Sequence, residues 1–187
     1  MTNQFDKTHV QDIYDIIAPH FDKTRAYLWN GVTNFLKALP NHSLVMDVGC
    51  GNGRNMSDIF SKQTPYLEFI GCDFSQSFTK ICHEKALEVF TGNNMSIGIR
   101  DNVCDAVISI AVIHHLSKEI DRRQCIDELI RITKKGGKIF IQVWAWERES
   151  GKKYQEQEQM IRWTLDAKYS PTGDKQILER YIQTGKT

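Results

Sequence analysis

Short apolar runs alternate along this chain with longer stretches in which apolar residues recur every three or four positions. The run at residues 105–110 is apolar on both faces, which is typical of a central strand in a parallel sheet. We expect strands at residues 44–48, 69–73, 88–91, 105–110 and 138–144. We expect helices at residues 10–18, 30–39, 54–62, 75–88 and 118–133, two of them capped by Ser75 and Ser117. The alternation predicts an α/β fold with a doubly wound, mostly parallel, Rossmann-like sheet of five strands.

The strand pattern stops at Trp144. Residues 147–159 are mostly charged or polar and show no strand alternation. We therefore expect a core domain at residues 1–146 and a charged extension at residues 147–187 that is partly helical or disordered. The last expected strand leaves an apolar edge at residues 140–143, and such an edge invites pairing with another chain.

Three alternate glycines, Gly49, Gly51 and Gly53, follow the first expected strand. Glycine lets the backbone turn tightly and approach a ligand that a Cβ atom would exclude. The second strand ends in Asp73, at about the distance along the chain where nucleotide-binding βαβ units carry the acid that accepts the ribose hydroxyls. The glycines and the acid together predict a nucleoside-cofactor site.

The register of the glycines argues against a dinucleotide, because the fingerprint G-x-G-x-x-G would need glycine where Arg54 stands. Asp47 lies two residues before the first glycine. Its charge would repel a pyrophosphate but attract the cationic amino-acid end of S-adenosylmethionine, which is therefore the expected cofactor. The alternative is a plain glycine-rich turn, with Asp47 as a helix-capping residue and Asp73 as a satisfied turn residue.

Ligands of such sheets lie beyond the carboxyl ends of the strands, near the point where the strand order reverses. The cofactor contacts expected at this edge are Asp47, Gly49, Cys50, Gly51, Gly53, Asp73, Phe74, Asn93, Asn94 and Ala111. The asparagine pair either meets the adenine edge or only forms a turn. Two adjacent histidines, His114 and His115, cannot share a helix face, so they do not suggest a metal site.

Composition and charge narrow the class of protein. The 187 residues fit one domain, and no signal peptide or membrane-spanning run is visible. The five cysteines form no C-x-x-C pair, so we expect a reducing cytoplasm and neither a zinc site nor a disulfide framework. The net charge of +1 gives no electrostatic case for nucleic acid or membrane binding by itself, and we expect no metal, no membrane contact and no DNA partner.

Residues 45–53, 70–73 and 105–115, with Val143-Trp144-Ala145, together resemble one family. The chain is similar, over about residues 9–146, to the class I methyltransferases that esterify 5-carboxymethyluridine at the wobble position of tRNA. The segment containing Tyr14, Arg25 and Trp29 is similar to that family as well. The resemblance implies S-adenosylmethionine as methyl donor, tRNA as substrate and a small zinc-binding methyltransferase activator protein as partner. Because the class has seven strands, it also implies that the last two are missing and that the chain is truncated at its C-terminus.

A substrate carboxylate is ionised at neutral pH, so the implied reaction needs alignment rather than a general base. The resemblance suggests that Arg25 orients the carboxylate while His114 and Trp144 shape the uridine pocket. Two other functions remain open. A small-molecule methyltransferase is favoured by the near-neutral charge. A silent relative that binds only cofactor or activator is favoured by the missing strands and by Asn93, where the family usually has aspartate.

Overall fold

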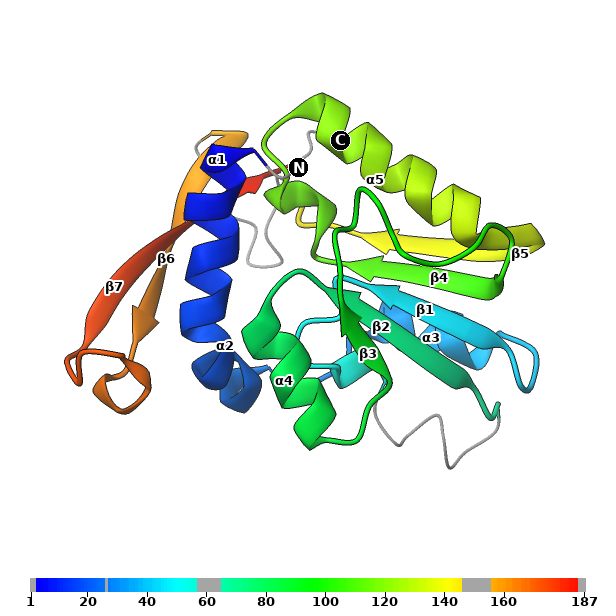
Figure 1. Cartoon of the computed structure of the whole chain (residues 1–187), viewed down its shortest axis with the longest axis horizontal. Helices are drawn as coiled ribbons and strands as arrows, with labels where there is room; N and C mark the ends of the chain where they lie inside the picture. Colours follow the sequence, from blue (N-terminus) through cyan, green and yellow to red (C-terminus); the bar gives the residue numbers. More distant parts are fainter. Residues whose placement is uncertain (1–2, 26, 57–64, 146–155, 185–187) are drawn as a thin grey trace.

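The computed structural model describes residues 3–25, 27–56, 65–145 and 156–184 (Figure 1). Five parallel strands form one sheet in the order β3-β2-β1-β4-β5. Their bounds are β1 Leu44–Val48, β2 Glu68–Asp73, β3 Val89–Thr91, β4 Cys104–Ile110 and β5 Thr133–Gln142. The strand order reverses between β1 and β4, so the predicted doubly wound, Rossmann-like sheet is confirmed.

Apolar residues on alternate positions of the central strands face two helical layers. Met46 and Val107 pack with Leu129 of α5 (Glu119–Ile132) on one face of the sheet. Val45 and Ile108 pack on the other face with α3 (Asn30–Lys37). Because both faces of β1 and β4 are covered, these strands read as continuous apolar runs.

The remaining helices differ from the prediction at their ends. The first helical segment comprises α1 (Gln4–Asp6), a π-helical stretch (Lys7–Gln11) and α2 (Asp12–Thr24), and it continues past Pro19. Helix α4 (Gln76–Glu84) starts after the predicted cap Ser75, whose hydroxyl accepts the amide of Phe78, but it ends before residue 88. A 3₁₀ turn (Arg54–Met56) begins the stretch predicted as a helix, and residues 57–62 of that prediction lie outside the described residues.

Ser117 does not cap α5, contrary to the prediction. The N-cap position is Lys118, without a side-chain cap. The amide of Ser117 instead donates to the carboxylate of Asp6, at 3.2 Å to Oδ1. A residue from the other end of the chain thus supplies the acceptor, which local sequence rules cannot reveal.

The prediction of a helical or disordered extension is wrong for residues 158–183. Strands β6 (Glu158–Leu165) and β7 (Gln176–Gln183) form an antiparallel hairpin outside the main sheet, and a 3₁₀ turn (Ala167–Tyr169) lies in the connection between them. The hairpin packs on α2 through buried Trp163 and Leu165, which lie two residues apart and contact Ile17. Figure 1 shows α2 between this hairpin and α4. One buried face explains why otherwise polar strands form here.

Within these described ranges, the main sheet ends at β5, as predicted. Ile141 at the end of β5 and Val143 just beyond it are 38% and 43% exposed. Pairing of this edge with another chain stays a prediction, as do the domain boundaries. Every helix in the described part of the chain is too short or too polar to span a bilayer.

Candidate active site

One cleft lies beyond the carboxyl ends of β1, β2 and β4, at the predicted edge of the sheet. The predicted residues that line it are Arg25, Gly49, Cys50, Gly51, Asp73, Phe74, Asn93, Asn94, Ala111, His114 and Trp144. Two predicted cofactor contacts, Asp47 and Gly53, do not line it. We call residues 49–51, 73–74, 93–95 and 111 the glycine half of the cleft. We call Tyr14, His114, His115, Trp144 and Arg180 the aromatic half.

The three glycines after β1 all have left-handed backbones, with φ angles of 78°, 53° and 73° at Gly49, Gly51 and Gly53. A Cβ atom at Gly53 would lie 2.3 Å from Leu87, so this glycine serves internal packing, which explains why it is not in the cleft. A Cβ atom at Gly51 would meet no atom of the described residues within 4 Å. Since Gly51 lines the cleft, this open space can take a ligand.

Asp73 ends β2 and fastens the glycine turn to it. Its Oδ2 atom accepts a 2.8 Å hydrogen bond from the amide of Gly51, and its Oδ1 atom accepts one of 2.9 Å from the amide of Ser75. Burial raises the pKa of this carboxyl to about 6, although the amide donors oppose the shift. A carboxylate oxygen accepts more than one hydrogen bond, so Asp73 can also bind hydroxyl groups of a ligand.

Asp47 is fully buried next to the glycine turn rather than in the cleft. Its Oδ2 atom accepts a 3.1 Å hydrogen bond from Asn55, and its Oδ1 atom has no partner among the described residues. Burial raises the pKa of Asp47 to about 7. Asn55 lines the cleft and Asp47 does not, so Asp47 contacts the cleft only through Asn55, which spacing along the sequence did not reveal.

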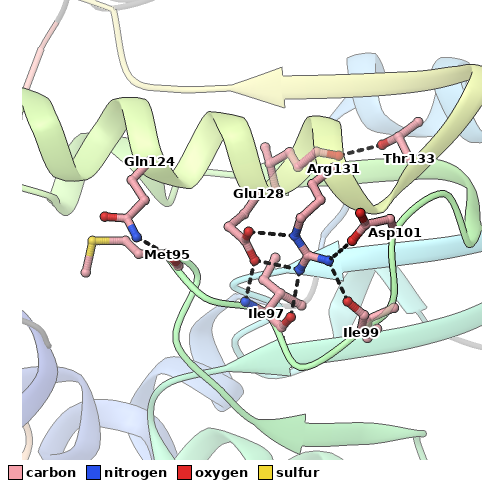
Figure 2. A network of polar contacts seen from close by, with 9 residues as sticks. Met95, Ile97, Ile99, Asp101, Gln124, Glu128, Arg131 and Thr133 are labelled. Atoms are coloured by element: carbon pink, nitrogen blue, oxygen red, sulfur yellow. Dashed lines mark hydrogen bonds and ion pairs between the residues drawn. The ribbon is translucent and has the colours of Figure 1, made fainter.

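The loop after β3 forms one wall of the glycine half and is held against α5 (Figure 2). The guanidinium of Arg131 donates to the carbonyl oxygens of Ile97 and Ile99 and forms an ion pair with Glu128. The side chain of Asn93 accepts the amide of Met95 at 2.9 Å. Asn93 therefore forms a turn, which is one of the two roles predicted for it. The turn places Asn93 at the cleft.

Arg180 of β7 is the main component of the aromatic half that sequence reasoning did not assign to the site. Its side chain is buried, 4% exposed, and its guanidinium carbon lies 5.3 Å from the ring centroid of Trp144 and 5.2 Å from that of Trp163. Its Nη1 atom donates a 2.7 Å hydrogen bond to the hydroxyl of Tyr14. The available signal was an arginine at the period-two position between Leu178 and Ile182.

His114 and His115 are both buried and uncharged. Burial lowers the pKa of His114 to about 3, and the Arg180 charge acts in the same direction. Burial also holds the pKa of His115 well below its ordinary value, with the neighbouring His114 and Arg180 adding to the shift. These rings therefore act as neutral hydrogen-bonding groups at physiological pH.

The partners of the two rings fix their protons. Nδ1 of His115 lies 2.7 Å from the carbonyl oxygen of Tyr181, so it carries the proton. Its Nε2 atom then accepts from the hydroxyl of Tyr14 at 2.8 Å and from Nε2 of His114 at 3.2 Å. The amide of Trp144 donates to Nδ1 of His114 at 3.2 Å. All four ring nitrogens are thus engaged within the protein, and neither ring has a free basic nitrogen.

Arg25 lies at the cleft, but it is exposed. Its guanidinium carbon lies 5.2 Å from the ring centroid of Trp163, and its Nη1 atom donates to the carbonyl oxygen of Thr24. The structure therefore brings Arg25, His114 and Trp144 to one cleft, as predicted. The roles predicted for them remain predictions.

Comparisons with known proteins agree with this geometry. The family described as methyltransferase domain matches residues 46–141. A tRNA (carboxymethyluridine(34)-5-O)-methyltransferase from Arabidopsis thaliana is 42% identical over 169 residues, covering 90% of this chain and 39% of that protein. The protein of that name from Schizosaccharomyces pombe is 35% identical over 173 residues, covering 90% of this chain and 73% of that protein. The chain spans well under half the length of the Arabidopsis relative.

Solved structures share the fold. The complex between the Haloferax volcanii Trm112 methyltransferase activator and the putative methyltransferase gives a TM-score of 0.60 at 19% identity, covering 71% of this chain and 59% of that chain. A SAM-dependent methyltransferase from Aquifex aeolicus gives 0.59 at 21% identity, covering 74% and 78%. The sheet, the cleft and the sequence identities lead to one conclusion: the chain belongs to the methyltransferase-domain family and, within it, to the family of the tRNA (carboxymethyluridine(34)-5-O)-methyltransferases.

Proposed function

We propose that this chain uses S-adenosylmethionine to methylate the carboxylate of 5-carboxymethyluridine at the wobble position of tRNA. The names of its relatives support this reaction. The observation that carries it is that the histidines of the aromatic half have no free ring nitrogen. A carboxylate with an ordinary pKa near ~4 is already ionised at neutral pH, so it needs no base to attack a methyl group.

The glycine half fits S-adenosylmethionine. The space beside Gly51 admits a ligand, and the carboxylate of Asp73 offers acceptors for the two ribose hydroxyls. Phe74, Asn93 and Asn94 lie where the adenine would be held, at the edge of the same cleft. When bound, the cofactor supplies an electrophilic methyl group.

The transfer itself balances without a proton. A carboxylate oxygen of the substrate forms a bond to the methyl carbon while the carbon–sulfur bond breaks and its electron pair moves to sulfur. The protein contributes alignment of the two reactants, an effect that can supply about 7–11 kcal/mol. His114 and Trp144 shape the pocket for the uracil ring, and Arg25 at the exposed side draws the substrate carboxylate towards the cleft.

We further propose a small zinc-binding activator protein as a partner. The support is the fold likeness to a methyltransferase that forms a complex with the Trm112 activator. Among the described residues, no cluster of His, Cys, Asp or Glu side chains could hold a metal ion, so the zinc would belong to the partner. The five cysteines are free and buried, which fits our assignment to the reducing cytoplasm.

The test measures methyl transfer from labelled S-adenosylmethionine to tRNA that carries 5-carboxymethyluridine, with and without the activator. The matched control is the same tRNA with unmodified uridine at the wobble position. We expect incorporation only into the modified tRNA, and base-stable labelling would show that no ester forms. Transfer to the free nucleoside but not to tRNA would favour a small-molecule methyltransferase. Cofactor binding without any transfer would favour the silent relative.

A further inference from the structure

Arg180 is a buried cation that has no counter-ion among the described residues. Its guanidinium makes one hydrogen bond there, from Nη1 to Tyr14, and its Nε atom is buried without a partner. Burying an unpaired charge is unfavourable, so proteins normally pair such groups. The unsatisfied guanidinium points to an anionic ligand that completes the site.

Two arginines elsewhere in the chain, Arg131 and Arg162, are paired with carboxylates. Arg131 is paired with Glu128 and Asp101. On the hairpin itself, exposed Arg162 lies 3.3 Å from Glu179, the residue next to Arg180. Because successive side chains of a strand face opposite sides, Glu179 is exposed while Arg180 is buried. On this hairpin, exposed Arg162 is therefore paired with a carboxylate, whereas Arg180 at the cleft has no carboxylate partner among the described residues.

The rings around Arg180 leave it available to an anion. Tyr14, Trp144 and Trp163 lie with their ring centroids 5.2–5.5 Å from the guanidinium carbon. Aromatic rings stabilise a cation through their faces and do not use up its N–H donors. Arg180 also lines the same cleft as Gly51 and Asp73, so an anion bound to it lies beside the expected cofactor.

We propose that Arg180 forms a carboxylate-binding subsite that receives the reacting carboxylate of the substrate. The subsite deepens the proposed function and rests on it for the identity of the substrate. Tyr14 is a positioning residue, because its hydroxyl donates to His115 and accepts from Arg180, holding the guanidinium in place. Arg25 is the exposed cation and Arg180 the buried one, and the guanidinium carbon of each lies 5.2 Å from the ring centroid of Trp163.

The subsite also distinguishes substrate from product. Methyl transfer turns the carboxylate into a neutral ester, which cannot form a charge-assisted pair with the guanidinium. Arg180 therefore favours the acid over the ester, and completion of the reaction weakens the hold on the modified base.

The experiment compares the affinities of 5-carboxymethyluridine and its methyl ester for the full chain, with S-adenosylhomocysteine present so that no transfer occurs. We expect the protein to prefer the acid by about 10–100-fold, the range for hydrogen bonds to a charged group. Arg180→Gln should bring the two affinities within about 3-fold, and Arg180→Lys should restore part of the preference because it keeps the charge but not the planar fork. Arg162→Gln, the matched control on the same hairpin, should retain the preference, because Arg162 is exposed and pairs with Glu179. Unchanged affinity for S-adenosylhomocysteine in every variant verifies that the glycine half is intact.

A retained preference in Arg180→Gln, or an equal loss of preference in Arg162→Gln, would overturn the subsite. A second probe separates this outcome from failure of the proposed function. Phenylacetate and phenylacetamide differ only in the charged group and can be titrated by tryptophan fluorescence. If the protein selects phenylacetate through Arg180 but does not methylate modified tRNA, the subsite stands and the proposed substrate is wrong. If it selects neither carboxylate over its neutral analogue, there is no carboxylate subsite.

Discussion

The two halves of the cleft differ in how far apart along the chain their hydrogen-bonded residues lie. In the glycine half, the hydrogen bond that fastens the turn joins Gly51 to Asp73, 22 residues apart within one βαβ unit. In the aromatic half, the bond from Arg180 to Tyr14 spans 166 residues. The residues of the glycine half all end or follow strands of the common sheet, whereas the aromatic half joins residues that follow β4 and β5 to Tyr14 of α2 and Arg180 of β7. In the proposed function, the glycine half binds the cofactor and the aromatic half selects the substrate.

The halves also differ in how their charges are satisfied. The carboxylate of Asp73 is held by two backbone amides before any ligand binds. In the described part of the chain, the guanidinium of Arg180 forms one hydrogen bond, to a neutral hydroxyl, and its Nε atom has no partner. The glycine half is therefore complete as a framework, while the aromatic half requires its ligand. Substitutions in one half should change binding there and leave the other half working.

The largest effect should follow from Asp73→Asn. The asparagine NH₂ group would face one of the two amide donors that Asp73 now accepts, and an acceptor for the ribose would be lost. We expect affinity for S-adenosylmethionine to fall by about 100-fold in isothermal titration, a magnitude typical of losing hydrogen bonds to a charged group. Asp105→Asn is the control, since Asp105 lies at the opposite end of the sheet and pairs with Lys134. Equal losses in both variants would mean that Asp73 acts on overall stability rather than on the cofactor.

Next in size should be Tyr14→Phe, which removes the hydroxyl between Arg180 and His115. Leaving buried donors and acceptors unpaired costs about 1–3 kcal/mol in the free energy of unfolding. We expect KM for the modified tRNA to rise by about 10-fold, a change of about 1.4 kcal/mol, with affinity for S-adenosylmethionine within 2-fold of the parent protein. Tyr27→Phe is the control, because Tyr27 is 87% exposed. An equal fall in affinity for S-adenosylmethionine would show that the two halves do not bind their ligands independently.

The glycine half could be predicted from the sequence better than the aromatic half, because its contacts lie closer together along the chain. The strands, the glycines and Asp73 follow local rules of periodicity and turn chemistry, so they could be predicted with their place at the sheet edge. Arg180 could not, because polar residues at 147–159 hid the period-two pattern that begins at Trp163. Its position depends on packing against α2, far away along the chain.

Within the glycine half, side-chain direction was the information that spacing lacked. Asp47 and Gly53 lie near the cleft along the chain but face the interior. The tautomers of His114 and His115 likewise depend on Tyr14 and on the carbonyl oxygen of Tyr181, which no local motif connects to them.

Asp47 should give the glycine half a dependence on pH. Burial raises its pKa to about 7 in the folded protein, above the ordinary aspartate pKa of about 4. The folded state therefore holds a proton that the unfolded state has lost, and stability falls as pH rises from about 4 through 7. Asp47→Asn is neutral throughout and keeps an acceptor for Asn55. Relative to the parent protein, the free energy of unfolding of Asp47→Asn should gain about 2–3 kcal/mol between pH 5 and pH 8, measured by urea unfolding. Parallel curves for the two proteins would show that Asp47 ionises normally.

The smallest effect should come from Ala111, whose φ of 59° places a Cβ-bearing residue in the left-handed region at the cleft. A residue with a Cβ atom in this region destabilises the folded state by about 1–2 kcal/mol. Glycine removes this strain, but its greater freedom in the unfolded chain offsets about 0.4–1 kcal/mol of the gain. Ala111→Gly should therefore raise the free energy of unfolding by about 0.5–1 kcal/mol. Ala86, with a φ of 56° at an exposed position after α4, is the matched control and should gain as much. Only Ala111→Gly should also lower affinity for S-adenosylmethionine, by about 2–3-fold, because it loosens a backbone held by the bond from the Ala111 amide to Gln142. If neither variant changes that affinity, the strained backbone at Ala111 follows from the route of the chain out of β4 and does not shape the cofactor site.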